Sequence, residues 1–373
     1  MAPVLALFSL SAISPDYLPR TLIFGAQIGY LWTIGYALCL MLTRLSPDQF
    51  RRLCVRGMWL LIAICAIELF TPMRAVFDQF RFEYYGARAY DAASRDILSM
   101  GGIRPMAFAS EPSYLALYFG LMFTGALFTS TRASQRLWAI VAFVAGVALI
   151  RSPSLVAPIA SIAVFYTTAF FSRKRCMGWK VFGSEKLLVL CAFYAALVAF
   201  VGVLAFGVEL DLGRIESLLS GEDRSFISRI GAPAEIARRV IDLSPWFGAG
   251  AGGNEVIYPI MYNVMSQMQG IYFDPARFAI LIGAPIVSHW TYFGIVGGLM
   301  MLAIYHTMFR RIIGKNMLLF WGTASSYLVL TGGYSYHTWI GIFFLAAIMV
   351  HTASLKTAIS EIVDREPRGI AVL

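Results

Sequence analysis

Long apolar stretches recur along this chain and constrain its fold more than any other feature. Hydrophobic residues make up 59% of the chain and charged residues 14%, whereas soluble domains carry about 25% charged residues. Stretches that cross, or nearly cross, the ~30 Å hydrocarbon core of a bilayer lie at 21–43, 56–70, 113–130, 137–150, 154–171, 187–207, 288–309, 317–332 and 338–354. We therefore expect an all-α fold, a polytopic transmembrane helical bundle of about ten spans if residues 2–13 form a short one.

Residues 2–13 have a second interpretation, because a signal peptide also contains a short apolar run. Residues 2–13 follow no basic region and precede no clear cleavage site, so we favour a span. The order of stretches then predicts three parts. These are N-terminal transmembrane helices with a first outward loop at 71–112 (1–207), a large outward loop carrying short helices (208–287), and C-terminal transmembrane helices with a cytoplasmic tail (288–373).

The basic residues predict which side each loop faces. Fourteen Arg or Lys against two acids lie in short segments that alternate correctly with the spans, at 44–56, 131–136, 172–186 and 310–316. The positive-inside rule makes these segments cytoplasmic. The long loops 71–112 and 208–287 then face outward. The net charge of +9 is thus mainly an orientation signal, and we do not expect a nucleic-acid partner.

Arginine supplies all the positive charge of the two long outward loops, whereas the five lysines lie on the predicted cytoplasmic side. The planar guanidinium can hold phosphate oxygens with two hydrogen bonds, but an ammonium acts as a point charge. The pattern is compatible with phosphate binding outside the membrane. Biased codon usage accounts for it equally well.

An arginine and a glutamate, Arg104 and Glu111, lie close together in RPMAFASEPSYLALYFG, where the first outward loop meets the next span. Burying either charge without a partner is costly, and ionisable residues at membrane depth commonly mark a functional site. A structural explanation stays open. The two charges could pair and fasten the loop onto a helix that begins at Pro112.

The same loop carries four arginines at a strict seven-residue spacing, namely Arg74, Arg81, Arg88 and Arg95. On a helix they share one face and could attract an anionic head group or glycan. Three acids lie close enough to neutralise much of this charge, namely Asp78, Asp91 and Asp96. We therefore favour an ordinary solvated interfacial helix.

The loop at 208–287 is too long for a simple connector, and loops of this length are usually functional. Helical periodicity runs from Ile230 to Ile241 and stops at Pro245 and a glycine cluster. Gly248, Gly250 and Gly253 match G-x-G-x-x-G, but no strand-helix-strand unit surrounds them, so a dinucleotide site is rejected. A tight backbone turn is favoured over a phosphate cradle.

Two histidines are candidates for chemistry. His289 opens a span in VSHWTYFGIVGGLMML, beside aromatic residues that equally suit a membrane interface. Gly294 and Gly298 follow at the spacing of a close helix-packing face. His337, in YSYHTWIG on a short outward turn, is a weaker candidate.

Three strings taken together resemble a family. They are RPMAFASEPSYLALY, SRIGAPAEIARRVIDLSPWFGAGAGG and SHWTYFGIVGGL. In this order and sidedness they are similar to the bacterial O-antigen polymerase and O-antigen ligase superfamily, which are membrane glycosyltransferases of the GT-C type. The resemblance covers most of the chain beyond residue 70. The chain departs from the family at Trp290, where relatives usually have Asn, and in lacking a tryptophan at 230–233.

The resemblance implies an active site that faces the periplasm from the bacterial inner membrane and uses a polyprenyl-pyrophosphate-linked glycan as donor. Its matching residues are Arg104, Arg229 and His289, with Glu111 belonging to the polymerase-like variant. Pyrophosphate is already a good leaving group, so this chemistry needs cations and one base. Arg104 and Arg229 would hold the pyrophosphate, and His289 or Glu111 would be the base. Auxiliary glycan or phosphate ligands would be Arg224, Arg238, Arg239 and His337.

The resemblance favours a polymerase, which extends another lipid-linked repeat unit by an inverting reaction without metal or other cofactor. Glu209 and Asp211 could hold a divalent metal, but a solvated acidic edge is the favoured interpretation. A chain-length regulator is a possible protein partner. The alternatives are an O-antigen ligase that uses lipid A core as acceptor, a polysaccharide or lipid transporter, and a noncatalytic scaffold. Against a transporter, the sequence has no evident internal repeat.

Overall fold

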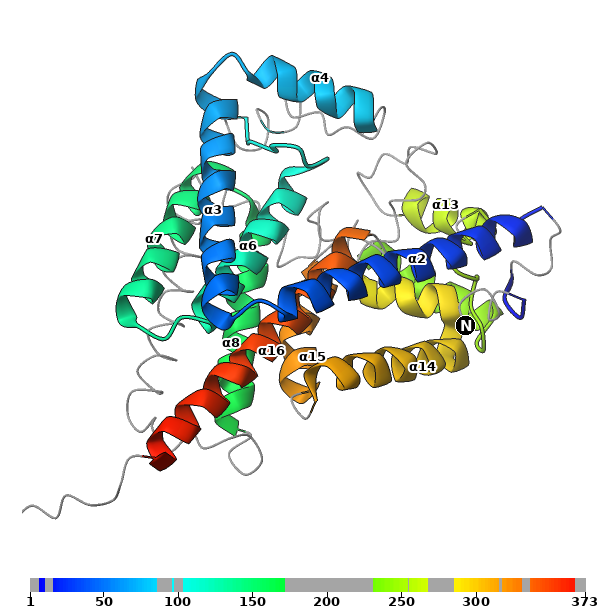
Figure 1. Ribbon diagram of the computed structural model, residues 1–373. Helices are drawn as coiled ribbons and strands as arrows, with labels where there is room; N and C mark the ends of the chain where they lie inside the picture. The colour runs from blue at the N-terminus through cyan, green and yellow to red at the C-terminus, as the bar shows by residue number, and fades with distance from the viewer. Residues whose placement is uncertain are drawn as a thin grey trace, which may run out of the picture. The chain divides into compact units, whose positions relative to one another are not determined.

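The computed structural model describes residues 7–10, 16–85, 96, 103–171, 231–253, 255–267, 285–314, 317–330 and 336–365. Regular structure in these ranges is helical throughout (Figure 1). The helices are α2 (Leu18–Thr43), α3 (Pro47–Phe70), α4 (Arg74–Tyr85), α6 (Pro112–Phe128), α7 (Ala133–Ile150), the 3₁₀ turn η3 (Pro153–Leu155), α8 (Val156–Phe171), α12 (Ala232–Leu243), α13 (Tyr258–Gln267), α14 (Pro285–Ile313), α15 (Met317–Leu330) and α16 (Tyr336–Arg365).

Helices coincide with eight of the nine predicted apolar stretches. The ninth, 187–207, and most of residues 2–13 lie outside the described residues. Among the described helices, five segments are long and apolar enough to cross a membrane, namely Leu22–Thr43, Pro47–Phe70, Ala133–Ile150, Val287–Ile313 and His337–Ser354. The chain is therefore an all-helical protein, in the part described, with several candidate membrane spans.

The chain forms two compact units that interleave along the sequence. The first comprises Met1–Ala37, Phe200–Arg311 and Ser325–Ile342, and the second comprises Leu38–Ala199, Ile312–Ala324 and Phe343–Leu373. Each unit draws on more than one of the three parts predicted from chain order. The candidate site residues are accordingly divided, with Arg104 and Glu111 in the second unit and His289 in the first.

The second unit is built on α3, which packs against α6 and α7, while α6 also contacts α8. A capping box starts α3, because the Ser46 hydroxyl accepts the Gln49 N–H and the Gln49 side chain accepts the Ser46 N–H. Close approach of α3 and α6 depends on Gly125, where an added Cβ would lie 2.8 Å from Sγ of Cys54. Small residues at such contacts are typical of membrane helix pairs.

The first unit contains α12, α13 and the greater part of α14. Its core includes three aromatic rings, those of Trp32 on α2, Tyr305 on α14 and Trp339 on α16. The ring centroids of Trp32 lie 4.3 Å from Tyr305 and 4.7 Å from Trp339. Such tilted contacts add to the stability that burial of the rings supplies.

Candidate functional site

A buried network of charges lies where α3 ends and α6 begins. Glu68, in the last turn of α3, is fully buried, and Arg81 of α4 is 2% exposed. Nη1 of Arg81 donates to Oε1 of Glu68 at 2.8 Å, and Arg81 also pairs with Asp78. The attraction within a buried ion pair offsets its desolvation cost only when the other lone pairs and N–H groups of the two side chains also have hydrogen-bond partners.

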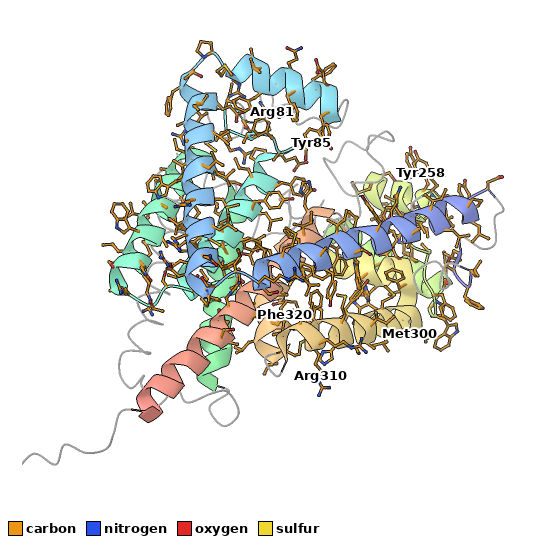
Figure 2. All side chains as sticks on the ribbon, in the orientation of Figure 1. Arg81, Tyr85, Tyr258, Met300, Arg310 and Phe320 are labelled. Carbon is orange, nitrogen blue, oxygen red and sulfur yellow. The ribbon has the colours of Figure 1, made fainter. Side chains whose placement is uncertain are left out.

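The loop that leads to α6 supplies those remaining partners. Oε2 of Glu68 accepts the backbone N–H of Met106 at 3.0 Å and of Ala107 at 2.6 Å. The carbonyl of Ala107 accepts Nη1 of Arg81 at 2.7 Å. Arg81 and Tyr85 project from α4 toward this loop (Figure 2), and the Tyr85 hydroxyl donates to the Phe108 carbonyl at 2.9 Å. Both the end of α3 and α4 thus hold the loop through its backbone.

Ala107 adopts a left-handed backbone conformation, with φ of 50°. A residue with a Cβ pays about 1–2 kcal/mol for this conformation. The hydrogen bonds to both backbone groups of Ala107 offset that cost. The loop conformation between Arg104 and Glu111 is therefore imposed by its neighbours rather than by local preference.

Arg104 pairs with Asp96 and not with Glu111, so the structural explanation in which those two charges pair is wrong. Nε and Nη2 of Arg104 donate to Oδ1 of Asp96 at 3.0 and 2.6 Å, and the Arg104 N–H donates to Oδ2 at 3.0 Å. The Asp96 side chain is fully buried, and that of Arg104 is 11% exposed. A buried carboxylate thus orients the guanidinium through two hydrogen bonds, and a third fixes the Arg104 backbone.

Glu111 occupies the N-cap position of α6, and Pro112 is the first residue of that helix. The predicted helix start at Pro112 is therefore confirmed. The Glu111 carboxylate makes no capping hydrogen bond and instead accepts the hydroxyl of Ser113 at 3.0 Å. It is partly exposed, in the positive field of a helix N-terminus. The Glu111 carboxylate is therefore accessible to solvent, whereas the Asp96 carboxylate is fully buried.

The arginines of α4 do not form a solvated ridge. Arg81 faces inward, and Nε of Arg74 lies 3.4 Å from Oδ2 of Asp78. The exposed side chains of α4 include Val76, Phe80 and Tyr84 instead. The prediction of an ordinary solvated helix is wrong for Arg81, because Glu68 offers a buried partner. Arg88 and Arg95 lie outside the described residues.

In the first unit, α14 is broken at Gly294, where φ is 62° and ψ is −164°. In a continuous helix the carbonyls of residues 291 and 292 would pair with the amides of residues 295 and 296. Here the segment at 245–250 pairs with all four groups. Ala249 and Gly250 donate to the carbonyls of Thr291 and Tyr292, both at 2.9 Å. Ile295 and Val296 donate to the carbonyls of Pro245 and Trp246, at 2.7 and 3.0 Å.

This segment is the glycine cluster noted in the sequence. Gly248, Gly250 and Gly252 have positive φ, so the prediction of a tight backbone turn is confirmed. The alternative of a phosphate cradle is wrong for Gly248, Ala249, Gly250 and Gly253, since their N–H groups donate to backbone carbonyls. The cluster supplies hydrogen-bond partners to the backbone groups that the helix break leaves unpaired within α14. Its chain path requires positive φ, which glycine adopts without steric cost.

His289 lies next to the break and is 4% exposed. Its Nε2 is 2.9 Å from the carbonyl oxygen of Gly298, on the other side of the break, so this nitrogen carries the proton. Gly298 packs against its own helix, because an added Cβ would lie 2.8 Å from the Trp290 ring. The expectation of a continuous packing face through Gly294 and Gly298 is therefore wrong.

The two arginines of α12 are held by acids and amides. Arg238 donates to Glu235 and Asp242, while Arg239 donates to Glu235, Asn263 and Gln267. Arg239 thereby joins α12 to α13. The hydrogen bonds from Arg238 and then Arg239 lower the pKa of Glu235 to about 2. These contacts give both arginines a structural role.

The remaining predicted residues fall into two groups. His337 belongs to the first turn of α16 and is 6% exposed, so it is not on a short outward turn as expected. The others lie outside the described residues, namely Arg224, Arg229, Glu209 and Asp211. Within the described ranges, no three His, Cys, Asp or Glu side chains group as metal ligands.

Glu68, Arg81 and Asp96 are the residues that the sequence interpretation missed as partners. Glu68 lies two residues before the end of a predicted span, and a carboxylate at such a depth signals a buried partner. Arg81 and Asp96 gave no comparable signal, because each lies among several equivalent charges in the loop. Only the fold selects between those charges.

Fold and site together define a class, an all-helical protein with several candidate membrane spans and a buried charge network at the end of one helix pair. No protein-family model matches the chain, and no curated protein matches it significantly.

Proposed function

We propose that this chain is a glycosyltransferase of the bacterial inner membrane whose active site faces the periplasm. It transfers a glycan from a polyprenyl-pyrophosphate donor to a sugar hydroxyl of another lipid-linked repeat unit. The proposal includes about ten spans, with the large loop 208–287 in the periplasm. The three family-like strings support it, and so does the arrangement of charges ahead of α6.

The observation that carries the proposal is the fixed orientation of Arg104. Its guanidinium is nearly buried and donates two hydrogen bonds to Asp96, and the backbone N–H of Arg104 donates a third. Arg104 lies seven residues ahead of Glu111 at the N-cap of α6. An oriented arginine loses little side-chain entropy when it binds phosphate oxygens. A pyrophosphate that approached this end of α6 would also meet the positive N-terminal field of the helix.

Glu111 is the better placed of the two candidate bases. Its carboxylate is partly exposed and accepts a hydrogen bond from the Ser113 hydroxyl. His289 is buried and uses Nε2 on the Gly298 carbonyl. We therefore assign the base to Glu111 and a positioning role to His289.

The reaction balances with these groups. Glu111 takes the proton of the acceptor hydroxyl as that oxygen forms a bond to the anomeric carbon. The bond from the anomeric carbon to the phosphate oxygen breaks, and the electron pair leaves with the polyprenyl pyrophosphate. Arg104 and Arg229 stabilise the departing charge. A single displacement inverts the configuration at the anomeric carbon.

Transport of the same lipid-linked glycan is the second candidate, because discontinuous membrane helices commonly form substrate sites in transporters. The break at Gly294 is such a discontinuity. However, the four backbone groups it frees pair with residues 245–250. This occupied break favours transfer over transport.

The test uses purified protein in detergent with a polyprenyl-pyrophosphate-linked oligosaccharide as the sole substrate. A ladder of longer glycans, formed without nucleotide sugar, supports a polymerase. Product only after addition of lipid A core identifies a ligase. Arg104→Ala and Glu111→Gln should each lower kcat/KM about 100-fold or more, whereas Arg52→Ala, an exposed control near the start of α3, should not. Full activity of both variants would refute the site.

A further inference from the structure

We propose that Glu68 is a positioning residue, which sets the left-handed turn at Ala107 and thereby the relative placement of Arg104 and Glu111. This inference rests on the proposed function. Glu68 belongs to α3 and is remote in sequence from the loop it would control. Its carboxylate is nevertheless the acceptor for two consecutive loop amides.

Side chains of α3 and α4 form hydrogen bonds with consecutive backbone groups of the loop, at residues 106–108. Glu68 holds the N–H groups of Met106 and Ala107, Arg81 holds the carbonyl of Ala107, and Tyr85 holds the carbonyl of Phe108. The turn also closes on itself, since the Ala109 N–H donates to the Met106 carbonyl at 2.9 Å. Consecutive backbone groups are thus fixed by side chains of α3 and α4.

Because Ala107 lies between Arg104 and Glu111, the contacts that fix Ala107 also affect the placement of these two charges. Ala107 lies three residues after Arg104 and four before Glu111, so its φ and ψ set how the two ends of the loop are directed. The left-handed region costs a residue with a Cβ about 1–2 kcal/mol, so Ala107 depends on hydrogen bonds from its neighbours to stay there. Loss of the Glu68 carboxylate should therefore release the loop and misplace both charges, although Glu68 touches neither.

The buried Arg81 explains why a carboxylate is required rather than an amide. One oxygen of Glu68 accepts the guanidinium, and the other accepts both loop amides. Glutamine has the same shape but a single acceptor oxygen. In Glu68→Gln, either the contact with Arg81 or the hydrogen bonds to the loop amides must therefore be lost.

The first experiment measures amide hydrogen exchange of the full-length protein in detergent. In Glu68→Gln, exchange at Met106 and Ala107 should rise about tenfold or more, while the core of α6 stays protected. Tyr85→Phe is a milder second variant that should fold, and it should raise exchange in the same loop to a smaller extent. Tyr84→Phe, which alters an exposed neighbour, is its control. Unchanged exchange at Met106 and Ala107 in Glu68→Gln would overturn the inference.

The second experiment separates positioning from stability by a rescue. Glu68→Gln should lower kcat/KM about tenfold or more per folded molecule. Adding Ala107→Gly, which removes the cost of the left-handed turn, should recover about threefold of that loss. Adding Ala109→Gly in the same loop should recover none. Equal effects of the two glycines, or unaltered kcat/KM in Glu68→Gln, would contradict positioning.

The two proposals fail in different ways. If the unmodified protein makes no glycan product with either acceptor, the proposed function is wrong. The exchange comparison then still decides whether Glu68 sets the loop. If the unmodified protein is active and Glu68→Gln changes exchange but not activity, only the positioning role is wrong.

Discussion

Gly248 and Gly294 approach each other backbone to backbone in the first unit. A Cβ on Gly294 would lie 2.6 Å from the amide nitrogen of Gly248, and a Cβ on Gly248 would lie 2.6 Å from the amide nitrogen of Gly294. Both residues also have positive φ, 64° and 62°. The helix break and the segment that fills it therefore depend on glycine at both positions.

Replacing either glycine by alanine should destabilise the first unit strongly. The left-handed backbone costs about 1–2 kcal/mol, and the forced displacement of backbone atoms adds about 1–3 kcal/mol. We expect Gly294→Ala to lower the free energy of unfolding by about 3 kcal/mol, measured by denaturant unfolding in detergent.

Two other glycines serve as controls for that measurement. Gly314 has φ of 73° but nothing within 4 Å of an added Cβ, so Gly314→Ala reports the backbone cost alone. Gly231 has ordinary φ and open space, so Gly231→Ala should be nearly neutral. Equal losses for Gly294→Ala and Gly314→Ala would show that the close contact at the break contributes nothing.

The ion pairs of the two units should differ in their contribution to stability. Arg81 and Glu68 are both buried, and removing one partner of such a pair costs about 3–5 kcal/mol. The side chain of Arg238 is 61% exposed, and exposed pairs contribute about 0–1 kcal/mol. Thermal unfolding should therefore show a large loss of Tm for Arg81→Met and almost none for Arg238→Met. Comparable losses for the two variants would contradict the burial of Arg81.

The stability contributed by Glu235 should depend on pH only in acid. Its pKa is lowered from 4.5 to about 2 by its two arginine partners, so the folded state favours the ionised form. The contribution is then complete above pH 4.5 and is lost as the pH falls toward 2. The stability difference between the unmodified protein and Glu235→Gln should be constant from pH 5 to 7 and shrink below pH 4.5. A difference that grows in acid would show the opposite sign of the shift.

The helices were predictable because their signals are local. Proline ahead of an apolar run predicted the helix start at Pro112. The periodicity from Ile230 to Ile241 corresponds to α12, observed at Ala232–Leu243. The glycine cluster likewise predicted a turn, because glycine adopts positive φ more readily than other residues.

The partners of the charged residues were not predictable by the same means. Arg104 has acids on both sides in sequence, Asp96 and Glu111, and nothing local decides between them. The pairing of Glu68 with Arg81 requires the chain to turn sharply between α3 and α4, as Figure 1 shows. The break in α14 was hidden as well, since Gly294 suits both a packed helix face and a left-handed bend.

The role of His289 can be separated from catalysis by two substitutions. Its Nε2 donates to the Gly298 carbonyl across the helix break, and a buried hydrogen bond contributes about 1 kcal/mol. His289→Gln keeps a donor amide, whereas His289→Phe keeps only the ring. We expect His289→Phe to lower the free energy of unfolding by about 1–3 kcal/mol, because the carbonyl loses its partner.

His289→Gln and Glu111→Gln together decide between the candidate bases. With Glu111 as the base, His289→Gln should retain transfer within about tenfold of the unmodified protein, since glutamine cannot accept a proton but can hold the break closed. Glu111→Gln should lower transfer about 100-fold or more while leaving the unfolding transition unchanged, because the Glu111 carboxylate makes no capping hydrogen bond and accepts one from the Ser113 hydroxyl. The measurement is single-turnover glycan transfer at saturating lipid-linked donor. Loss of transfer in His289→Gln, with full activity in Glu111→Gln, would reverse the assignment and make His289 the base.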